Sequence, residues 1–363
     1  MKKKIPTSYR YSWVTRFINF WKKRKLPPVF TSLIFFHLLP SGLVLLVFSL
    51  TGYWGTFFSR GFNILFPGFL GFFMPAILPY LTWRYETKVL PRFFSDLSAF
   101  LGQSEEAPED LISKFNKLTK ILKISIQSLG AFLQLYYAFK LFDAAQQIFR
   151  VPNMWSPSYL IVVAVGAFLV YLAGLGLALV STSTARQCLI IRSLEPSNIN
   201  PTHFDRLGGT GFFNRLSVTT AAFLIPMSLA IPFFAQIIPR SIAPNLPFFF
   251  VPLAIYLIII ISAFSIPTAF LAHTLKRTRE FHLSGWIKEY EKSFTEFRKT
   301  TDTNQILLIN ARTTQLREHY REVEKMRILP WKPNVLFLLL GTLIFPLVIA
   351  LIQHLLGRLF NAP

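Results

Sequence analysis

The chain is poor in acidic residues and has almost no cysteine. Asp and Glu number only 17 in 363 residues, against 38 Lys and Arg, so the net charge is +21. A single cysteine, Cys188, excludes an intramolecular disulfide framework and any metal site built from several cysteines. All charged residues together make up 15% of the chain, below the roughly 25% of soluble domains. This composition argues against an ordinary soluble fold.

Complete catalytic motifs are also missing. The sequence has no His-Glu-x-x-His pair, no Cys/His cluster, no phosphate-binding loop and no Gly-x-Ser-x-Gly elbow. We therefore expect no metal and no cofactor, and the sequence favours a non-enzymatic role.

Long apolar runs are what the sequence has in abundance. Hydrophobic residues form 52% of the chain and the mean hydropathy is +0.44. A bilayer core of about 30 Å needs about 20 apolar residues per helix. Seven segments meet this requirement, although the third is weakened by Gln127, Gln134 and Lys140. The sequence thus predicts an all-α polytopic membrane bundle with spans at Phe30–Leu50, Ile64–Trp83, Ser125–Phe142, Ser158–Ser181, Thr219–Ile238, Leu246–Ala272 and Leu336–Leu356.

Basic residues alternate between the connections of these spans. The N-terminus and every second connection hold nine, seven, four and thirteen Lys and Arg, whereas the other connections and the tail hold one each. Cytoplasmic loops of membrane proteins are enriched in Lys and Arg. We therefore expect a bacterial inner (plasma) membrane protein with a cytoplasmic N-terminus and an extracytoplasmic C-terminus. Because the basic residues are spread over all cytoplasmic pieces, we do not expect nucleic acid to bind.

The spans divide the chain into four parts. The N-terminal part interleaves Lys and Arg with aromatic residues, a pattern typical of an interfacial helix on an anionic leaflet. The predicted parts are a basic interfacial segment (1–28), a six-helix bundle (29–272) with cytoplasmic loops 84–124 and 182–218, a cytoplasmic helical hairpin (273–335), and a last span with a short tail (336–363).

The predicted hairpin carries an apolar seam. Its first helix has Leu283, Ile287, Tyr290, Phe294 and Phe297 at spacings of 4, 3, 4 and 3, the period of a coiled-coil seam. The second helix repeats the pattern, with one face formed by Leu316, Tyr320, Val323 and Met326. A protein partner or a second copy of the chain could dock on residues 276–327. Packing of the two helices on each other would also account for the seam.

The most distinctive cytoplasmic segment precedes the fifth span. Two of its residues, His203 and Asp205, could offer an imidazole and a carboxylate to a ligand, and its glycines would allow close backbone approach. Alternatively, the segment is a tight turn in which Asp205 caps a helix or pairs with Arg206. The candidate residues are His203, Asp205, Arg206, Gly208, Gly209 and Gly211; His37 and Lys140 are intramembrane polar candidates.

Two segments resemble a family of bacterial multi-pass membrane proteins. Residues 203–212 are similar to its HPDxxGGLGF signature, with Phe204 and Thr210 in place of proline and leucine. Residues 319–330 and the following apolar span resemble its C-terminal part. The resemblance covers roughly the second half of the chain. It implies the multi-pass architecture and singles out residues 203–212, but it implies no activity.

Three functions follow as hypotheses. The first is a membrane scaffold or partner-binding protein, based on the seamed hairpin. The second is a transporter or channel, based on the many prolines in the spans, which kink helices. The third is a membrane-interface enzyme that uses His203 and Asp205.

Overall fold

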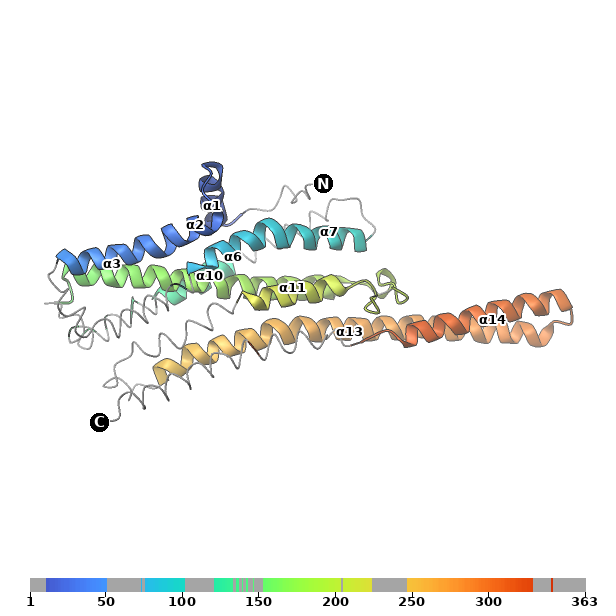
Figure 1. Cartoon of the computed structure of the whole chain (residues 1–363). Coiled ribbons are helices and arrows are strands. Elements are labelled where there is room, and N and C mark those ends of the chain that lie inside the picture. Colours follow the sequence, from blue (N-terminus) through green and yellow to red (C-terminus); the bar gives the residue numbers. More distant parts are fainter. Residues whose placement is uncertain are drawn as a thin grey trace, which may run out of the picture.

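The structure is a computed structural model of the chain. It describes residues 11–50, 73, 76–101, 121–132, 135, 136, 139, 142, 146, 153–203, 205–223, 247–328 and 341. All regular structure in these residues is helical, which confirms the all-α prediction for them. The helices run roughly along one direction, and a helical hairpin extends beyond the others at one end (Figure 1).

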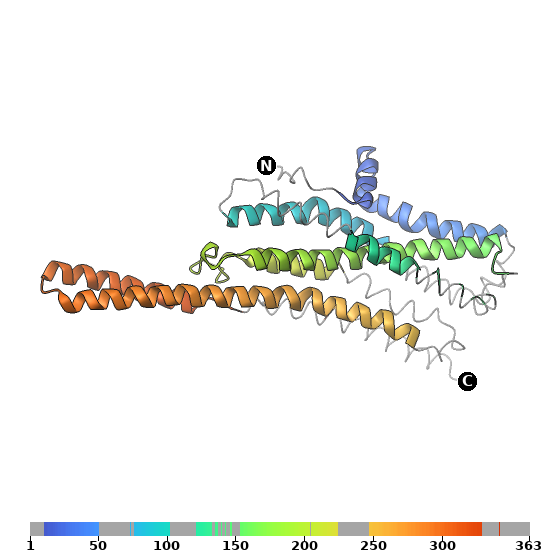
Figure 2. The same cartoon turned by 180° about the vertical axis from the view of Figure 1, so that it is seen from behind.

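The N-terminal basic segment forms a helix that differs in direction from the rest. Helix α1 (Trp13–Lys23) begins at Ser12, whose hydroxyl accepts a hydrogen bond from the Thr15 backbone N–H. It ends on Lys22 and Lys23, where positive charge is favourable next to the helix C-terminus. Both views show α1 standing steeply across the direction of α2 (Pro28–Leu33) and α3 (Leu39–Leu50) (Figures 1 and 2).

Two π-helical turns interrupt the N-terminal half, and each lies just before a proline. The turn η1 (Ile34–Leu38) precedes Pro40, and η3 (Tyr85–Val89), which joins α6 (Leu78–Arg84) to α7 (Leu90–Phe100), precedes Pro91. Proline has no backbone N–H and its ring clashes with the carbonyl four residues earlier. A wider turn before the proline accommodates this clash, and π-turns of this kind occur frequently at functional sites.

Within the described residues, two helices are long and apolar enough to cross a membrane. They are Pro28–Val47 and Pro157–Ser193, which coincide with the predicted first and fourth spans. A shorter apolar helix, Ile121–Phe132, covers the start of the predicted third span. Most of the second and fifth predicted spans and nearly all of the seventh lie outside the described residues. The count of seven spans therefore stays a prediction.

The helices extend well past the predicted span ends. Helix α10 (Pro157–Ser193) has 37 residues, a length of about 55 Å by helical rise. Its last turns pack with α7, α11 (Gly211–Ala222) and the short η4 (Pro196–Asn198) around a buried core. Phe93 lies at the centre of this core, with ring centroids of Phe212 and Phe213 each 5.6 Å away. Parts of the predicted loops 84–124 and 182–218 thus form packed helical structure.

Helix α13 (Pro247–Lys299) is a single helix of 53 residues. It begins beside the bundle and continues without a break into the hairpin, where it packs against α14 (Thr303–Glu324) (Figure 1). Asp302 caps α14 by accepting a hydrogen bond from the Asn304 backbone N–H. The turn between the two helices is formed by residues 300–302, poor helix formers.

Candidate functional sites

The segment around Asp205 is a tight turn built on one carboxylate. Oδ1 of Asp205 accepts hydrogen bonds from the backbone N–H groups of Leu207 (2.8 Å) and Gly209 (3.0 Å). Its Oδ2 accepts one from Gly211 (3.3 Å), the first residue of α11. Asp205 therefore caps the N-terminus of α11, where a negative charge is also favoured by the helix dipole.

His203 lies against the same carboxylate. Its Nδ1 is 2.9 Å from Oδ1 of Asp205 and 3.3 Å from the Asp205 backbone nitrogen, so the imidazole contacts both the carboxylate and the backbone of this residue. Burial alone raises the pKa of Asp205, but the hydrogen bonds from Gly209, Leu207 and His203 outweigh this effect and hold the pKa below its ordinary value. Asp205 is thus an ionised structural acceptor, and the basic side chain that lies against it among the described residues is His203 rather than Arg206.

Left-handed backbone conformations fix the shape of this turn. Arg206, Gly208 and Gly209 have φ of 55°, 66° and 83°. A side chain at Gly208 would also clash, because a Cβ there would lie 2.2 Å from Cγ2 of the buried Ile199. At Gly209 a Cβ would lie 3.3 Å from the Phe100 ring. The glycines are therefore required by conformation and by close packing.

The turn also holds the base of the hairpin. The backbone N–H of Arg327, just after α14, donates to the Arg206 carbonyl at 2.8 Å. Met326 is buried in the same core as Leu207 and Phe212, and its Cε lies 3.2 Å from the Cβ position of Gly208. Residues 203–211 thus connect α10, α11 and the end of α14.

The two intramembrane candidates differ in what the structure describes. His37 lies in η1, is 1% exposed, and meets the Phe73 ring edge-on with centroids 5.3 Å apart. This position in a π-helical turn before Pro40 fits a backbone adjustment to the proline. Lys140 lies outside the described residues.

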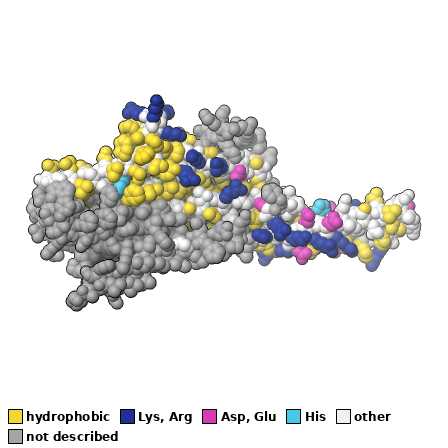
Figure 3. Space-filling view, viewed as in Figure 1, with side chains coloured by type: hydrophobic (Ala, Val, Ile, Leu, Met, Phe, Trp, Pro, Cys, Tyr) yellow, Lys and Arg dark blue, Asp and Glu magenta, His cyan; other side chains and the backbone are white. Residues whose placement is uncertain are grey.

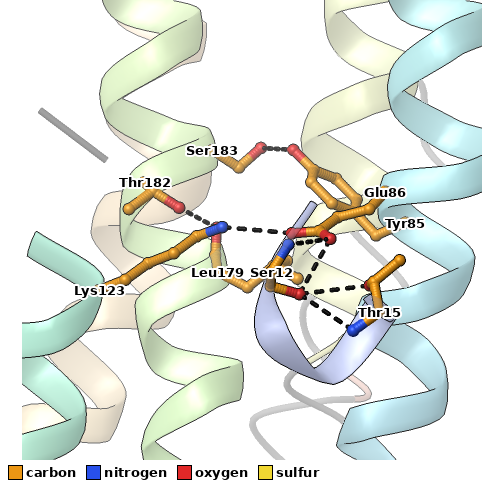
Figure 4. A network of polar contacts seen from close by, with 8 residues as sticks. All are labelled: Ser12, Thr15, Tyr85, Glu86, Lys123, Leu179, Thr182 and Ser183. Carbon is orange, nitrogen blue, oxygen red and sulfur yellow. Dashed lines mark hydrogen bonds and ion pairs between the residues drawn. The ribbon is translucent and has the colours of Figure 1, made fainter. Parts of the chain in front are cut away.

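A buried charged group lies where α1, η3 and helix Ile121–Phe132 meet (Figure 4). Glu86 in η3 has no exposed surface. Its Oε2 accepts hydrogen bonds from the backbone N–H and the hydroxyl of Ser12, both at 2.9 Å. Its Oε1 lies 3.4 Å from Nζ of Lys123. One carboxylate therefore joins the start of α1 to two helices that are distant in sequence.

Polar side chains continue from this group into the bundle. The Tyr85 hydroxyl donates to Ser183 Oγ at 2.7 Å (Figure 4). Ser183 Oγ in turn lies 3.0 Å from Thr220 Oγ1. Gln187 bonds both Ser183 and Ser217, and all of these side chains are buried. Arg186, 4% exposed, is buried in the same part of α10. Such a network fixes one arrangement of the helices, because each buried polar group loses a bond if they move.

The sequence pattern did not predict this group. Glu86, Lys123 and Arg186 fall in the predicted loops 84–124 and 182–218, where charged residues are expected to be exposed to solvent. One signal was available: Glu86 is the first acidic residue of the chain, after 85 residues without Asp or Glu. A single carboxylate among so many basic residues is a natural partner for a buried cation.

The hairpin presents part of its predicted seam to the outside. Ile287, Phe294 and Phe297 are 45%, 45% and 38% exposed. Helix α14 packs along one side of the seam: His319 meets Trp286 with ring centroids 4.9 Å apart, and Arg317 Nη2 donates to the hydroxyl of the seam residue Tyr290 at 3.2 Å. Of the predicted face, Leu316 and Val323 of α14 are buried, Tyr320 is partly buried, and Met326 is buried just beyond the end of α14.

The described residues contain no group of three or more His, Cys, Asp or Glu side chains able to hold a metal ion. Comparison with protein-family models, with curated proteins and with solved structures finds no match to this chain. The resemblance based on residues 203–212 and 319–330 stays a prediction.

Proposed function

We propose that the chain is a non-enzymatic, multi-pass protein of the bacterial inner membrane whose cytoplasmic hairpin docks a helix of a partner protein. Two helices able to cross a membrane and the alternation of basic residues along the chain support the membrane location. The seven spans and the orientation belong to this proposal.

The observation that carries the docking role is the exposed seam of α13. A helix that only packed within its own hairpin would bury its most apolar face. Here α14 contacts Trp286 and the polar Ser293 is 1% exposed, while Ile287, Phe294 and Phe297 stay accessible. Large exposed apolar side chains in a row mark interaction surfaces. Self-packing therefore does not account for this part of the seam.

An α-helix is the occupant that fits this surface. The spacing of the exposed residues follows the heptad period, which matches the side chains of a second helix in the manner of a coiled coil. Charges of both signs flank the seam, including Glu291 and Arg298, so the surface selects a partner helix with mixed charge rather than an acidic or basic polymer.

Site-specific crosslinking tests this proposal. A photoreactive benzoylphenylalanine at Phe294 or Phe297 should give one defined protein adduct in intact cells. The same group at Lys292, exposed on the same helix but outside the seam, should not. The double variant Ile287→Ser/Phe297→Ser should lower the adduct yield from position 294 by about tenfold, the loss expected when about 1.4 kcal/mol of apolar contact is removed.

The adduct's identity separates the outcomes. A mass matching another protein, or a second copy of the chain, supports docking and names the occupant. Equal yields from positions 292 and 294, or no adduct from 294 and 297 in a chain of unchanged helicity, would overturn the proposal.

A second candidate, transport, is favoured by the charged groups around Glu86. Glu86 and Arg186 are buried, Lys123 is partly buried, and all three lie just outside the predicted spans. Ionisable groups within membrane bundles often mark ion or substrate paths. Transport predicts that a cysteine replacing Ser183 in a Cys188→Ser chain reacts with a soluble thiol reagent. Complete protection of that cysteine would count against transport. The interface-enzyme hypothesis gains no support, because both oxygens of Asp205 bind backbone groups of the turn.

A further inference from the structure

Two lysines from different elements lie over one indole ring. Nζ of Lys22, in α1, is 5.1 Å from the centroid of the Trp83 ring, and Nζ of Lys88, in η3, is 6.0 Å from it. Trp83 is 5% exposed, and its Nε1–H donates to Asn19 Oδ1 of α1 at 2.8 Å. The ring is thus fixed, and cation–π attraction holds two ammonium groups near it.

These ammonium groups have no acidic partner among the described residues. Neither Lys22 nor Lys88 forms a described ion pair. The acid nearest in sequence, Glu86, is fully buried and is occupied by Ser12 and Lys123. Lys23, Arg24 and Lys25 add exposed positive charge at the end of α1. The surface around Trp83 is therefore strongly positive and available to an anion.

Apolar side chains border the same surface. Phe20 of α1 is 49% exposed, and Val29 and Phe30 of α2 are 42% and 57% exposed. In the space-filling view, dark blue basic side chains lie beside a continuous hydrophobic area (Figure 3). A ligand that unites an anionic group with hydrocarbon would satisfy both surfaces at once, which a free phosphate ion would not.

We propose that Lys22, Lys88 and Trp83 form a binding site for the phosphate headgroup of an anionic phospholipid. The inference rests on the proposed membrane location. It goes beyond the general attraction of a basic segment to an anionic leaflet, because it assigns one headgroup to two lysines that are 66 positions apart and converge on one ring. Sites of this type, basic pockets between helices at the cytoplasmic side, recognise phospholipid headgroups.

Lipid retention measures the site directly. The full chain is placed in nanodiscs of phosphatidylcholine and phosphatidylglycerol mixed four to one, and the lipids that stay bound on release are counted by native mass spectrometry. The wild type should retain phosphatidylglycerol preferentially. The variant Lys22→Gln/Lys88→Gln should lower this preference about tenfold, an amount equivalent to about 1.4 kcal/mol.

A charge-matched control makes the test specific. The variant Lys23→Gln/Lys25→Gln removes the same charge from the same exposed region but leaves both groups over Trp83 in place. It should lower the preference clearly less than Lys22→Gln/Lys88→Gln does, because Lys23 and Lys25 attract anionic lipid only through the general surface potential. Equal losses in the two double variants would overturn the proposal and leave only general attraction.

Two further outcomes are separable. If millimolar inorganic phosphate displaces the bound phosphatidylglycerol, the site belongs to free phosphate and the lipid proposal is wrong. If the protein is absent from the membrane fraction of the cells, the proposed membrane location is wrong. A chain that enters nanodiscs but shows no preference refutes the headgroup site alone.

Discussion

At the scale of single residues, Gly208 is the position with the least freedom. Its φ of 66° and the 2.2 Å approach of Ile199 to its Cβ position act together. The variant Gly208→Ala should lower the free energy of unfolding by about 2 kcal/mol or more, since a left-handed alanine costs about 1–2 kcal/mol before any clash is counted. Thermal unfolding in detergent measures the change.

Gly285 provides the opposite control on the same chain. It lies in the exposed part of α13 with nothing within 4 Å of its Cβ position. Alanine is the better helix former by about 1 kcal/mol, so Gly285→Ala should raise the unfolding temperature. A Gly208→Ala chain as stable as the wild type would show that the turn relaxes without cost and does not hold the hairpin base.

The sequence pattern singled out residues 203–211 but did not decide their role. Two hypotheses, a ligand site and a glycine-dependent turn, were both compatible with it. The structure shows Asp205 bonded to three backbone N–H groups. Which N–H groups an Asp side chain reaches depends on φ at Arg206, Gly208 and Gly209, and a single sequence does not specify those angles.

At the scale of elements, Glu86 determines where α1 begins. Its Oε2 accepts two hydrogen bonds from Ser12, the N-terminal cap of α1, and its charge faces Lys123. In Glu86→Gln the neutral amide oxygen accepts more weakly from Ser12 than the carboxylate does, and the amide cannot neutralise Lys123. We expect the free energy of unfolding to fall by about 1–3 kcal/mol, less than for a fully buried ion pair, because Lys123 is partly exposed.

Hydrogen–deuterium exchange locates this effect. Amides of residues 12–18 should exchange faster in Glu86→Gln, whereas Glu195→Gln, which removes an exposed carboxylate, should leave them unchanged. Unchanged exchange at α1 in both variants would mean that Glu86 does not fix the start of this helix.

The hairpin seam shows which features of packing hydrophobic periodicity predicts and which it does not. Spacings of 3 and 4 placed Leu316 and Val323 on one face of the second helix, and both are buried, because one helix face must pack. Met326 is buried too, but beyond the end of α14, in the core around Leu207. The same spacings on α13 identified an apolar face but did not show which element packs on it. Burial of Ser293 and exposure of Phe294 follow from where the chain reverses at residues 300–302, which periodicity does not encode.

At the scale of the whole molecule, the proposed orientation can be tested by cysteine labelling, because the chain has only one native cysteine, Cys188. In a Cys188→Ser background, a cysteine at Ser284 on the hairpin should react with a membrane-impermeant maleimide only after the cells are lysed. A cysteine at Asn361 should react in cells whose outer membrane alone is permeable. The charge difference between the two sides gives the reason.

Either reversed labelling or equal labelling of the two positions would contradict the orientation. Reversal would place the thirteen basic residues of 273–335 outside the cell, and equal reactivity would mean that an even number of spans separates the two cysteines.

Composition predicted the helical class, because long apolar runs leave few alternatives to helices. It did not predict how far the helices continue. Helix α10 runs twelve residues past the predicted span end at Ser181 to Ser193, because its last turns bury Ile190 and Ile191 in the core with Phe93. That core depends on contacts between distant segments, which hydropathy along the chain does not contain.

The uninterrupted length of α13 gives the molecule the properties of a lever. A rod of 53 residues measures about 80 Å, and its two ends lie beside the bundle and at the hairpin tip. Because one helix runs from Pro247 to Lys299, we expect movement at the tip to reach its base. The Arg327–Arg206 bond and the Gly208 turn hold the other helix of the hairpin at its end next to the bundle. Small rotations of the bundle correspondingly become large displacements of whatever the tip holds.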